Sequence, residues 1–164
     1  MAIKNSDTYY GVRRRSQQLK MLGEIAGEAS GEAEFKNFLN KSSESIRKSF
    51  NYSSVQIWMG SRNRLEVVGF ASKSENDAVS DPSTVLIVKE CWDQNQTLVS
   101  NSPHSGFQVE RDGNGGSWFA TPIRLRKECI GVLFIESDQL DAFTCDDTAA
   151  IQSAASLIAA RFYN

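Results

Sequence analysis

The residue types that most often carry catalysis or bind metals are scarce in this chain of 164 residues. It has one histidine, His104, and three cysteines, Cys91, Cys129 and Cys145, and no two of them lie close together in the sequence. The closely spaced pairs of zinc sites and dithiol redox motifs are therefore missing. Glu136 is the only acidic residue expected within a strand core, and no base or nucleophile is paired with it. These observations predict that the chain is not an enzyme and that it uses no metal or cofactor.

The charge balance gives no reason to expect a polyanionic partner. The chain has 18 basic and 20 acidic residues and a net charge of −2, so we expect neither nucleic-acid binding nor recruitment to a membrane surface. The longest apolar run, Ile130–Ile135, is far shorter than the roughly 20 residues that span a bilayer. The N-terminus has no apolar signal core, and scattered cysteines suit a reducing compartment. The sequence predicts a cytoplasmic protein without membrane insertion.

Aromatic side chains are better candidates for a binding site than the titratable ones. Tryptophan can stack on a flat ligand and donate one hydrogen bond. The alternative is that these aromatic residues simply fill the core, which would leave the domain without a ligand. The candidate ligand contacts are Trp58, Phe70, Trp92, His104, Trp118, Phe119 and Thr121.

The elements that must position these residues follow from the spacing of apolar residues. Steps of three and four predict helices over 13–30 and 35–50, and a last helix over 144–164 that Thr144 caps. Alternation predicts two hairpins, 55–59 with 65–71 and 118–125 with 129–136, and a short strand over 96–100. A helix is preferred over 84–92, although β-branched residues there also suit a strand. Residues 101–116 are rich in glycine and are expected to form a long loop.

Three consecutive arginines, at positions 13–15, stand near the expected start of the first helix. Positive charge at a helix N-terminus is unfavourable. Two explanations stay open: the helix begins further upstream, or the triplet is a solvated basic turn. Residues 1–12 are expected to be a flexible tail because they contain few apolar groups.

Several segments follow one another in a characteristic order: Arg13–Leu19, Ile46–Tyr52 with the strand Val55–Met59, Ala120–Ile123 followed by Ile130–Ser137, and Ala142–Asp147 before a helix rich in alanine. Taken together, these segments resemble GAF domains of bacterial sensory proteins over residues 13–164. The resemblance implies an α+β fold with a central antiparallel sheet of five to six strands. Terminal helices would cover one face, while a short helix and loops would cover the other and form a pocket.

The resemblance implies two functional hypotheses and a less favoured third. The first is a regulatory signal-transduction domain that senses a small molecule and relays its ligand state through the terminal helices, with an output domain in a longer chain. The second is a ligand-free module for dimerisation and signal relay. The third is an enzyme like free methionine sulfoxide reductase, which the scattered cysteines disfavour. Candidate residues for a homodimer of the terminal helices are Leu19, Leu22, Ala26, Ala155, Ile158 and Phe162.

Overall fold

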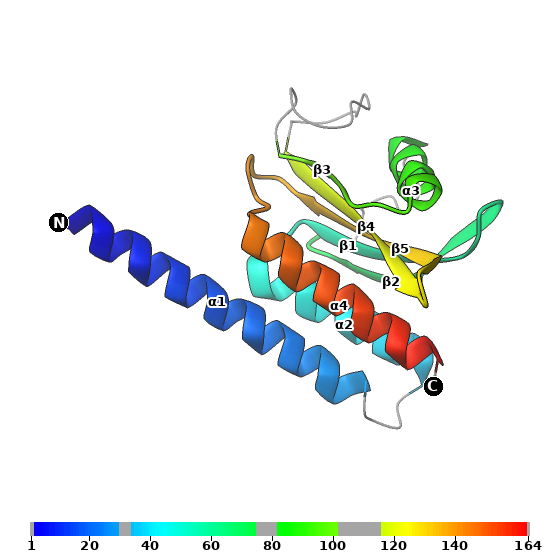
Figure 1. Ribbon diagram of the computed structural model, residues 1–164, viewed down its shortest axis with the longest axis horizontal. Helices are drawn as coiled ribbons and strands as arrows, with labels where there is room; N and C mark the ends of the chain where they lie inside the picture. Colours follow the sequence, from blue (N-terminus) through cyan, green and yellow to red (C-terminus); the bar gives the residue numbers. More distant parts are fainter. Residues whose placement is uncertain (1, 30–33, 75–81, 102–115, 164) are drawn as a thin grey trace.

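Five antiparallel strands form one sheet in the computed structural model, which describes residues 2–29, 34–74, 82–101 and 116–163 (Figure 1). The strand order across the sheet is β2-β1-β5-β4-β3. Both hairpins that the sequence predicts are present, as β1 with β2 and β4 with β5. The elements in chain order are α1 (Ala2–Ala29), α2 (Phe35–Phe50), β1 (Ser54–Ser61), β2 (Arg64–Ser72), α3 (Pro82–Gln94), β3 (Leu98–Ser100), β4 (Ser117–Leu125), β5 (Glu128–Ser137) and α4 (Cys145–Tyr163).

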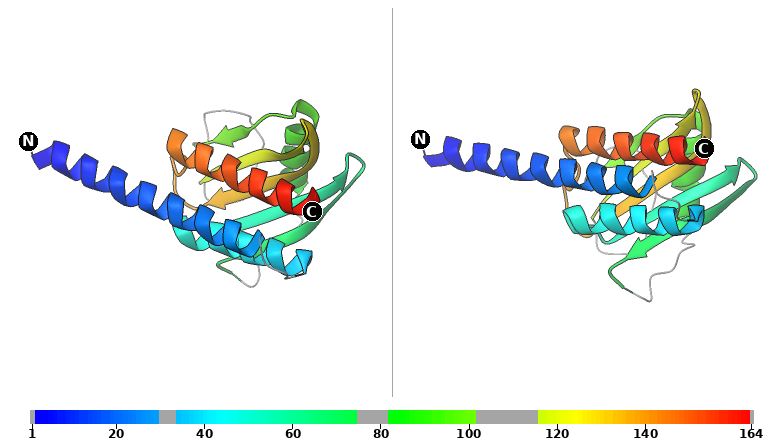
Figure 2. Two further views of the ribbon diagram at one scale, coloured as in Figure 1. Left: turned by 60° about the horizontal axis from the view of Figure 1, so that its bottom comes forward. Right: turned by 90° about the horizontal axis from the view of Figure 1, so that it is seen from below.

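Helices cover both faces of the sheet. Helices α2 and α4 pack on one face, which we call the helix face, and α3 packs on the other, which we call the α3 face (Figure 1). Helix α1 packs on α2 and α4 and forms an outermost layer (Figure 2). The predicted fold class is confirmed, including the helix over 84–92, which lies within α3.

Each face of the sheet carries its own apolar cluster. Because side chains alternate along a strand, Ile57 and Leu133 point to the helix face, whereas Trp58 and Phe134 point to the α3 face. Ile87 of α3 packs on the second cluster and is fully buried. Burial of each such side chain contributes about 1.5–3 kcal/mol to folding.

Helix α1 begins earlier than the sequence predicts. It starts at Ala2, so residues 2–12 are helical, and the prediction of a flexible tail is wrong for them. The domain boundary at residue 13 stays a prediction. The arginine triplet therefore lies about three turns inside the helix, and the explanation by an upstream start is confirmed. The inner side of α1 is buried and includes Gln18, Met21 and Ile25. The N-terminal part of α1 extends beyond the rest of the protein (Figure 2).

Gly131 allows β5 to approach β1 closely. A Cβ atom at this position would lie 2.3 Å from the backbone oxygen of Trp58, a contact that no other residue type could make without moving the strand. The sequence predicts such a close approach from the glycine within an apolar strand.

The ends of the helices follow local sequence signals. Asn51 ends α2 in the left-handed conformation, with φ of 57°, which is the geometry that asparagine tolerates at a helix C-terminus.

Among the described residues, none of the helices is both long enough and apolar enough to cross a bilayer.

Candidate functional site

The α3 face brings four of the predicted ligand contacts to one side of the sheet. Trp58 and Trp118 belong to its apolar cluster, and the half-buried Trp92 of α3 packs against that cluster. Phe70 of β2 is half-buried and pairs with Gln56 of β1. The indole Nε1 of Trp58 donates to Oε1 of Gln56 at 2.9 Å, which places Gln56 on the same face. These four aromatic residues form one cluster with a buried amide beside it, which we call the aromatic surface; Trp58 and Trp118 are buried, and Trp92 and Phe70 are half-buried.

A carboxylate stands at the end of this aromatic surface. Glu136 is half-buried in β5, next to Trp118 in the sheet register, and Ser54 Oγ lies 3.4 Å from its Oε2. A carboxylate in this position can accept hydrogen bonds from an ammonium, amide or hydroxyl group of a ligand. The sequence suggests Glu136 only as a catalytic acid, because its place beside Trp118 depends on a strand pairing that the sequence does not show.

The remaining three predicted contacts do not join this surface. Phe119 lies on the helix face, with its ring centroid 5.4 Å from that of Phe143. Thr121 also points toward the helices, since its Oγ1 lies 2.8 Å from Oγ1 of Thr97, to which Gln152 of α4 donates. The cause is strand alternation, which turns residues 119 and 121 away from the face of Trp118. His104 lies outside the described residues.

The residues predicted for a dimer also divide into two groups. Ala155 and Ile158 pack in the cluster of the helix face and are buried within the chain, so their side chains do not reach its outer surface. The buried alanines of α4 let this helix approach the sheet closely. The others lie wholly or partly at the surface: Leu19, Leu22, Ala26 and Phe162.

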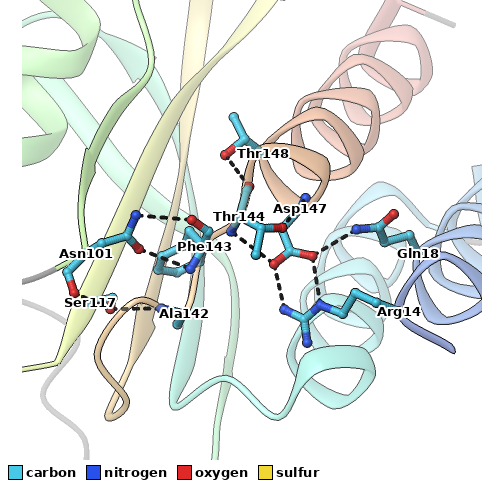
Figure 3. Close-up of polar contacts among 9 residues, drawn as sticks. All are labelled: Arg14, Gln18, Asn101, Ser117, Ala142, Phe143, Thr144, Asp147 and Thr148. Carbon is cyan, nitrogen blue, oxygen red and sulfur yellow. Dashed lines mark hydrogen bonds and ion pairs between the residues drawn. The ribbon is translucent and has the colours of Figure 1, made fainter. Parts of the chain in front are cut away.

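A second polar cluster joins α1 to the start of α4 (Figure 3). Asp147 and Thr144 form a reciprocal helix cap, because the Asp147 N–H donates to Thr144 Oγ1 at 3.1 Å and the Thr144 N–H donates to Asp147 Oδ2 at 3.2 Å. Arg14 donates from Nε to Oδ1 at 2.8 Å and from Nη2 to Oδ2 at 2.7 Å. Gln18 Nε2 donates to Oδ1 at 2.8 Å. We call these four residues the α1–α4 junction.

The electrostatics of this junction favour the ionised pair. The Asp147 side chain has no exposed surface, whereas that of Arg14 is 34% exposed. Burial by itself would raise the pKa of Asp147, but the hydrogen bonds from Arg14, Gln18 and Thr144 outweigh it, and the pKa lies below its ordinary value. The Arg14 guanidinium also lies 4.4 Å from the centre of the Phe50 ring, a favourable cation–π distance.

Further hydrogen bonds tie the ends of β3 and β4 to the loop before α4 (Figure 3). Asn101, directly after β3, exchanges two hydrogen bonds of 3.1 Å with the backbone of Phe143. Ser117, the first residue of β4, accepts from the Ala142 N–H at 3.2 Å and lies 2.7 Å from the backbone oxygen of Gln139. The sheet is thereby connected through this loop to the α1–α4 junction.

Neither part of this network follows from the local sequence. The spacing Thr144-x-x-Asp147 is a helix-capping signal, but nothing local to it indicates Arg14, which is 133 positions away. The sequence predicts only a loop at Asn101, because its partner Phe143 also lies far away in the sequence.

The three cysteines lie in different environments. Cys91 is buried in α3, its thiol donates to the backbone oxygen of Gln96 at 3.4 Å, and burial raises the pKa of this thiol to about 12. Burial also raises the pKa of the half-buried Cys129. Cys145 is exposed at the start of α4. The thiols of Cys91 and Cys129 are therefore protonated near neutral pH, which suppresses their reactivity as nucleophiles.

Comparison with known families identifies the class of protein that this fold defines. The family model of the GAF domain matches residues 34–161. The chain therefore belongs to the GAF domain family. Helix α1 lies outside the matched range.

Solved structures with this fold include both GAF domains and enzymes. The free methionine-R-sulfoxide reductase of Neisseria meningitidis, in complex with its substrate, has 17% identity and a TM-score of 0.75, covering 89% of this chain and 88% of that one. The GAF domain of the Acinetobacter phosphoenolpyruvate-protein phosphotransferase has 12% identity and a TM-score of 0.69, covering 89% and 92%. The GAF domain of A. aeolicus nlh2 in an inactive state has 16% identity and a TM-score of 0.71, covering 92% and 98%. Curated protein sequences give no match.

These similarities correct the prediction that the chain is not an enzyme. Free methionine-R-sulfoxide reductases of several organisms share its fold at 17–19% identity. The GAF fold thus supports catalysis as well as regulation. The scarcity of histidine and of paired cysteines was not a sufficient reason to exclude enzymatic activity.

Proposed function

We propose that this protein is a regulatory domain that binds a small molecule on its α3 face and relays the ligand state through α1 and α4. The observation that carries the proposal is the half-buried Glu136 carboxylate at the end of the aromatic surface. Membership of the GAF family supports a regulatory role. The hydrogen bonds of Asn101 and Ser117 support the relay, since they connect the sheet to the start of α4.

The chemistry of the α3 face favours a ligand with a primary ammonium group. A carboxylate beside tryptophan rings attracts a cation both by charge and by cation–π contact. The fold also occurs in an enzyme that acts on free methionine-R-sulfoxide, which is itself an amino acid with such a group. We therefore propose free amino acids and related amines as the ligand class.

The first test is a thermal-shift and calorimetric comparison of amino acids with their N-acetylated forms. A ligand at a hundred times its Kd should stabilise the protein by about 2.7 kcal/mol. Glu136→Gln keeps the side-chain shape but removes the charge, and it should weaken binding by at least about tenfold, because a charge-assisted hydrogen bond contributes about 1.5–3 kcal/mol. Glu128→Gln, an exposed site on the same strand, is the matched control. A flat response to every amine would contradict ligand sensing, and equal binding by both variants would contradict the role of Glu136.

A second candidate function is dimerisation through α1, favoured by the exposed position of Leu19. This side chain is 64% exposed on a helix that extends beyond the rest of the protein (Figure 2). If α1 pairs with α1 of a second copy, Leu19→Lys should shift sedimentation from dimer to monomer. Leu86→Lys, at an exposed leucine of α3, should leave the dimer intact. A monomeric wild-type protein at high concentration would contradict this candidate.

A further inference from the structure

The hydroxyl of Tyr52 is an unused hydrogen-bond donor beneath the α1–α4 junction. Tyr52 is only 1% exposed, and its Oη has no hydrogen-bond partner among the described residues. Most buried hydroxyl groups in proteins are hydrogen-bonded, because an unpaired one loses its contacts with water without replacement. This exception therefore needs a physical explanation.

The packing of Tyr52 places it between the two sides of the junction. Its ring centroid lies 5.4 Å from that of Phe50, and the Arg14 guanidinium lies over the Phe50 ring. On the other side it stacks on Phe143, at 5.2 Å, and Phe143 directly precedes the cap residue Thr144. Burial is the main reason that the pKa of Tyr52 is raised; the charge of Asp147 raises it further, and the charge of Arg14 lowers it. The phenol is thus protonated and able to donate.

Most of the hydrogen bonds to the Asp147 carboxylate come from α1. Two hydrogen bonds come from Arg14 and one from Gln18, and both residues belong to α1. Helix α1 is the outermost layer and lies outside the residues that the GAF family model matches. If α1 moved away, the carboxylate of Asp147 would lose these donors and keep its hydrogen bond from the backbone N–H of Thr144. The carboxylate would then need other donors to replace the three hydrogen bonds that it loses.

We propose that Asp147 exchanges partners when α1 leaves its docked position. With α1 docked, Asp147 binds Arg14 and Gln18, and the Tyr52 hydroxyl stays unpaired. With α1 displaced, the Tyr52 hydroxyl donates to Asp147 and keeps the first turn of α4 intact. The docked state thus leaves the Tyr52 hydroxyl unsatisfied and the displaced state satisfies it, which brings the two states closer in free energy and makes the docking of α1 reversible. This inference does not require a ligand on the α3 face.

Native-state amide exchange of the full chain, followed by NMR, tests the proposal. Arg14→Gln should speed exchange of the α1 amides by about tenfold or more, equal to about 1.4 kcal/mol of opening free energy. The amides of Asp147 and Thr148 at the start of α4 should stay protected, because Tyr52 replaces the lost donors. Arg15→Gln, at the exposed neighbouring arginine, is the matched control and should change neither region.

The decisive comparison is Tyr52→Phe in two backgrounds. In the wild-type background it should leave exchange of the Asp147 and Thr148 amides unchanged, because the hydroxyl is unpaired there. In the Arg14→Gln background it should speed their exchange by about tenfold. Equal effects in both backgrounds, or no effect in either, would overturn the proposal. A folding comparison gives a further test. If Arg14→Gln failed to fold but the double variant Arg14→Gln with Asp147→Asn folded, the proposal would also be overturned. Tyr52 would then have failed to stabilise the Asp147 carboxylate.

Discussion

Replacing Asp147 with alanine should lower the free energy of unfolding by about 3 kcal/mol. The change removes one side of the α4 cap, which is worth about 1 kcal/mol, and leaves the partly buried Arg14 without its carboxylate, which adds about 2 kcal/mol. Urea unfolding, followed by tryptophan fluorescence, measures the loss. Asp146→Ala, at the exposed neighbouring position, should cost no more than about 0.3–1 kcal/mol, from the helix dipole alone. Similar losses for the two variants would show that the α1–α4 junction contributes little.

The same carboxylate predicts a dependence of stability on pH. The pKa of Asp147 is lower in the folded protein than in the unfolded chain, so its contribution is fully present above the unfolded value of about 3.9. It is lost as the pH falls below about 4 and through the lower folded pKa. Asp147→Ala should therefore lose less stability than wild type when the pH is lowered from about 5 to 2. Parallel pH profiles for the two proteins would contradict this assignment.

Replacing Phe143 with alanine should destabilise the protein by about 3–5 kcal/mol, the usual range for removing a buried phenylalanine. Its ring stacks on Tyr52 at 5.2 Å and lies 5.4 Å from Phe119, and it is almost fully buried. The loss of both contacts leaves a cavity between the sheet and the start of α4. Thermal and urea unfolding should both report it.

Two control substitutions separate packing from the hydrogen bonds of Phe143. Phe143→Leu should cost less than Phe143→Ala, because it fills part of the cavity. Asn101→Ala removes the side chain that binds the backbone of Phe143, and it should cost about 1–3 kcal/mol. If Phe143→Ala cost no more than Phe143→Leu, the ring would not be a main anchor of this loop.

The aromatic surface shows how far strand patterns can predict a site. The alternation in the sequence placed Trp58 and Trp118 in strands correctly, and both lie on the α3 face. The same alternation puts Phe119 and Thr121 on the face opposite Trp118, so the sequence gives no ground for grouping them with it. Which side of a strand faces which layer depends on the helices that pack there, and the spacing within one strand does not contain that information.

The sequence by itself determined the local elements, because their signals are local: apolar periodicity, the Thr144 cap, and the glycine that β5 needs beside β1. It also indicated the family, which the match over residues 34–161 confirms. Only the tertiary structure decided which side chains share a face, where Glu136 meets the aromatic surface, and that Arg14 binds Asp147. The physical reason is that these contacts join residues far apart in the sequence. Their free energy comes from burial and charge pairing, which exist only after the layers have packed.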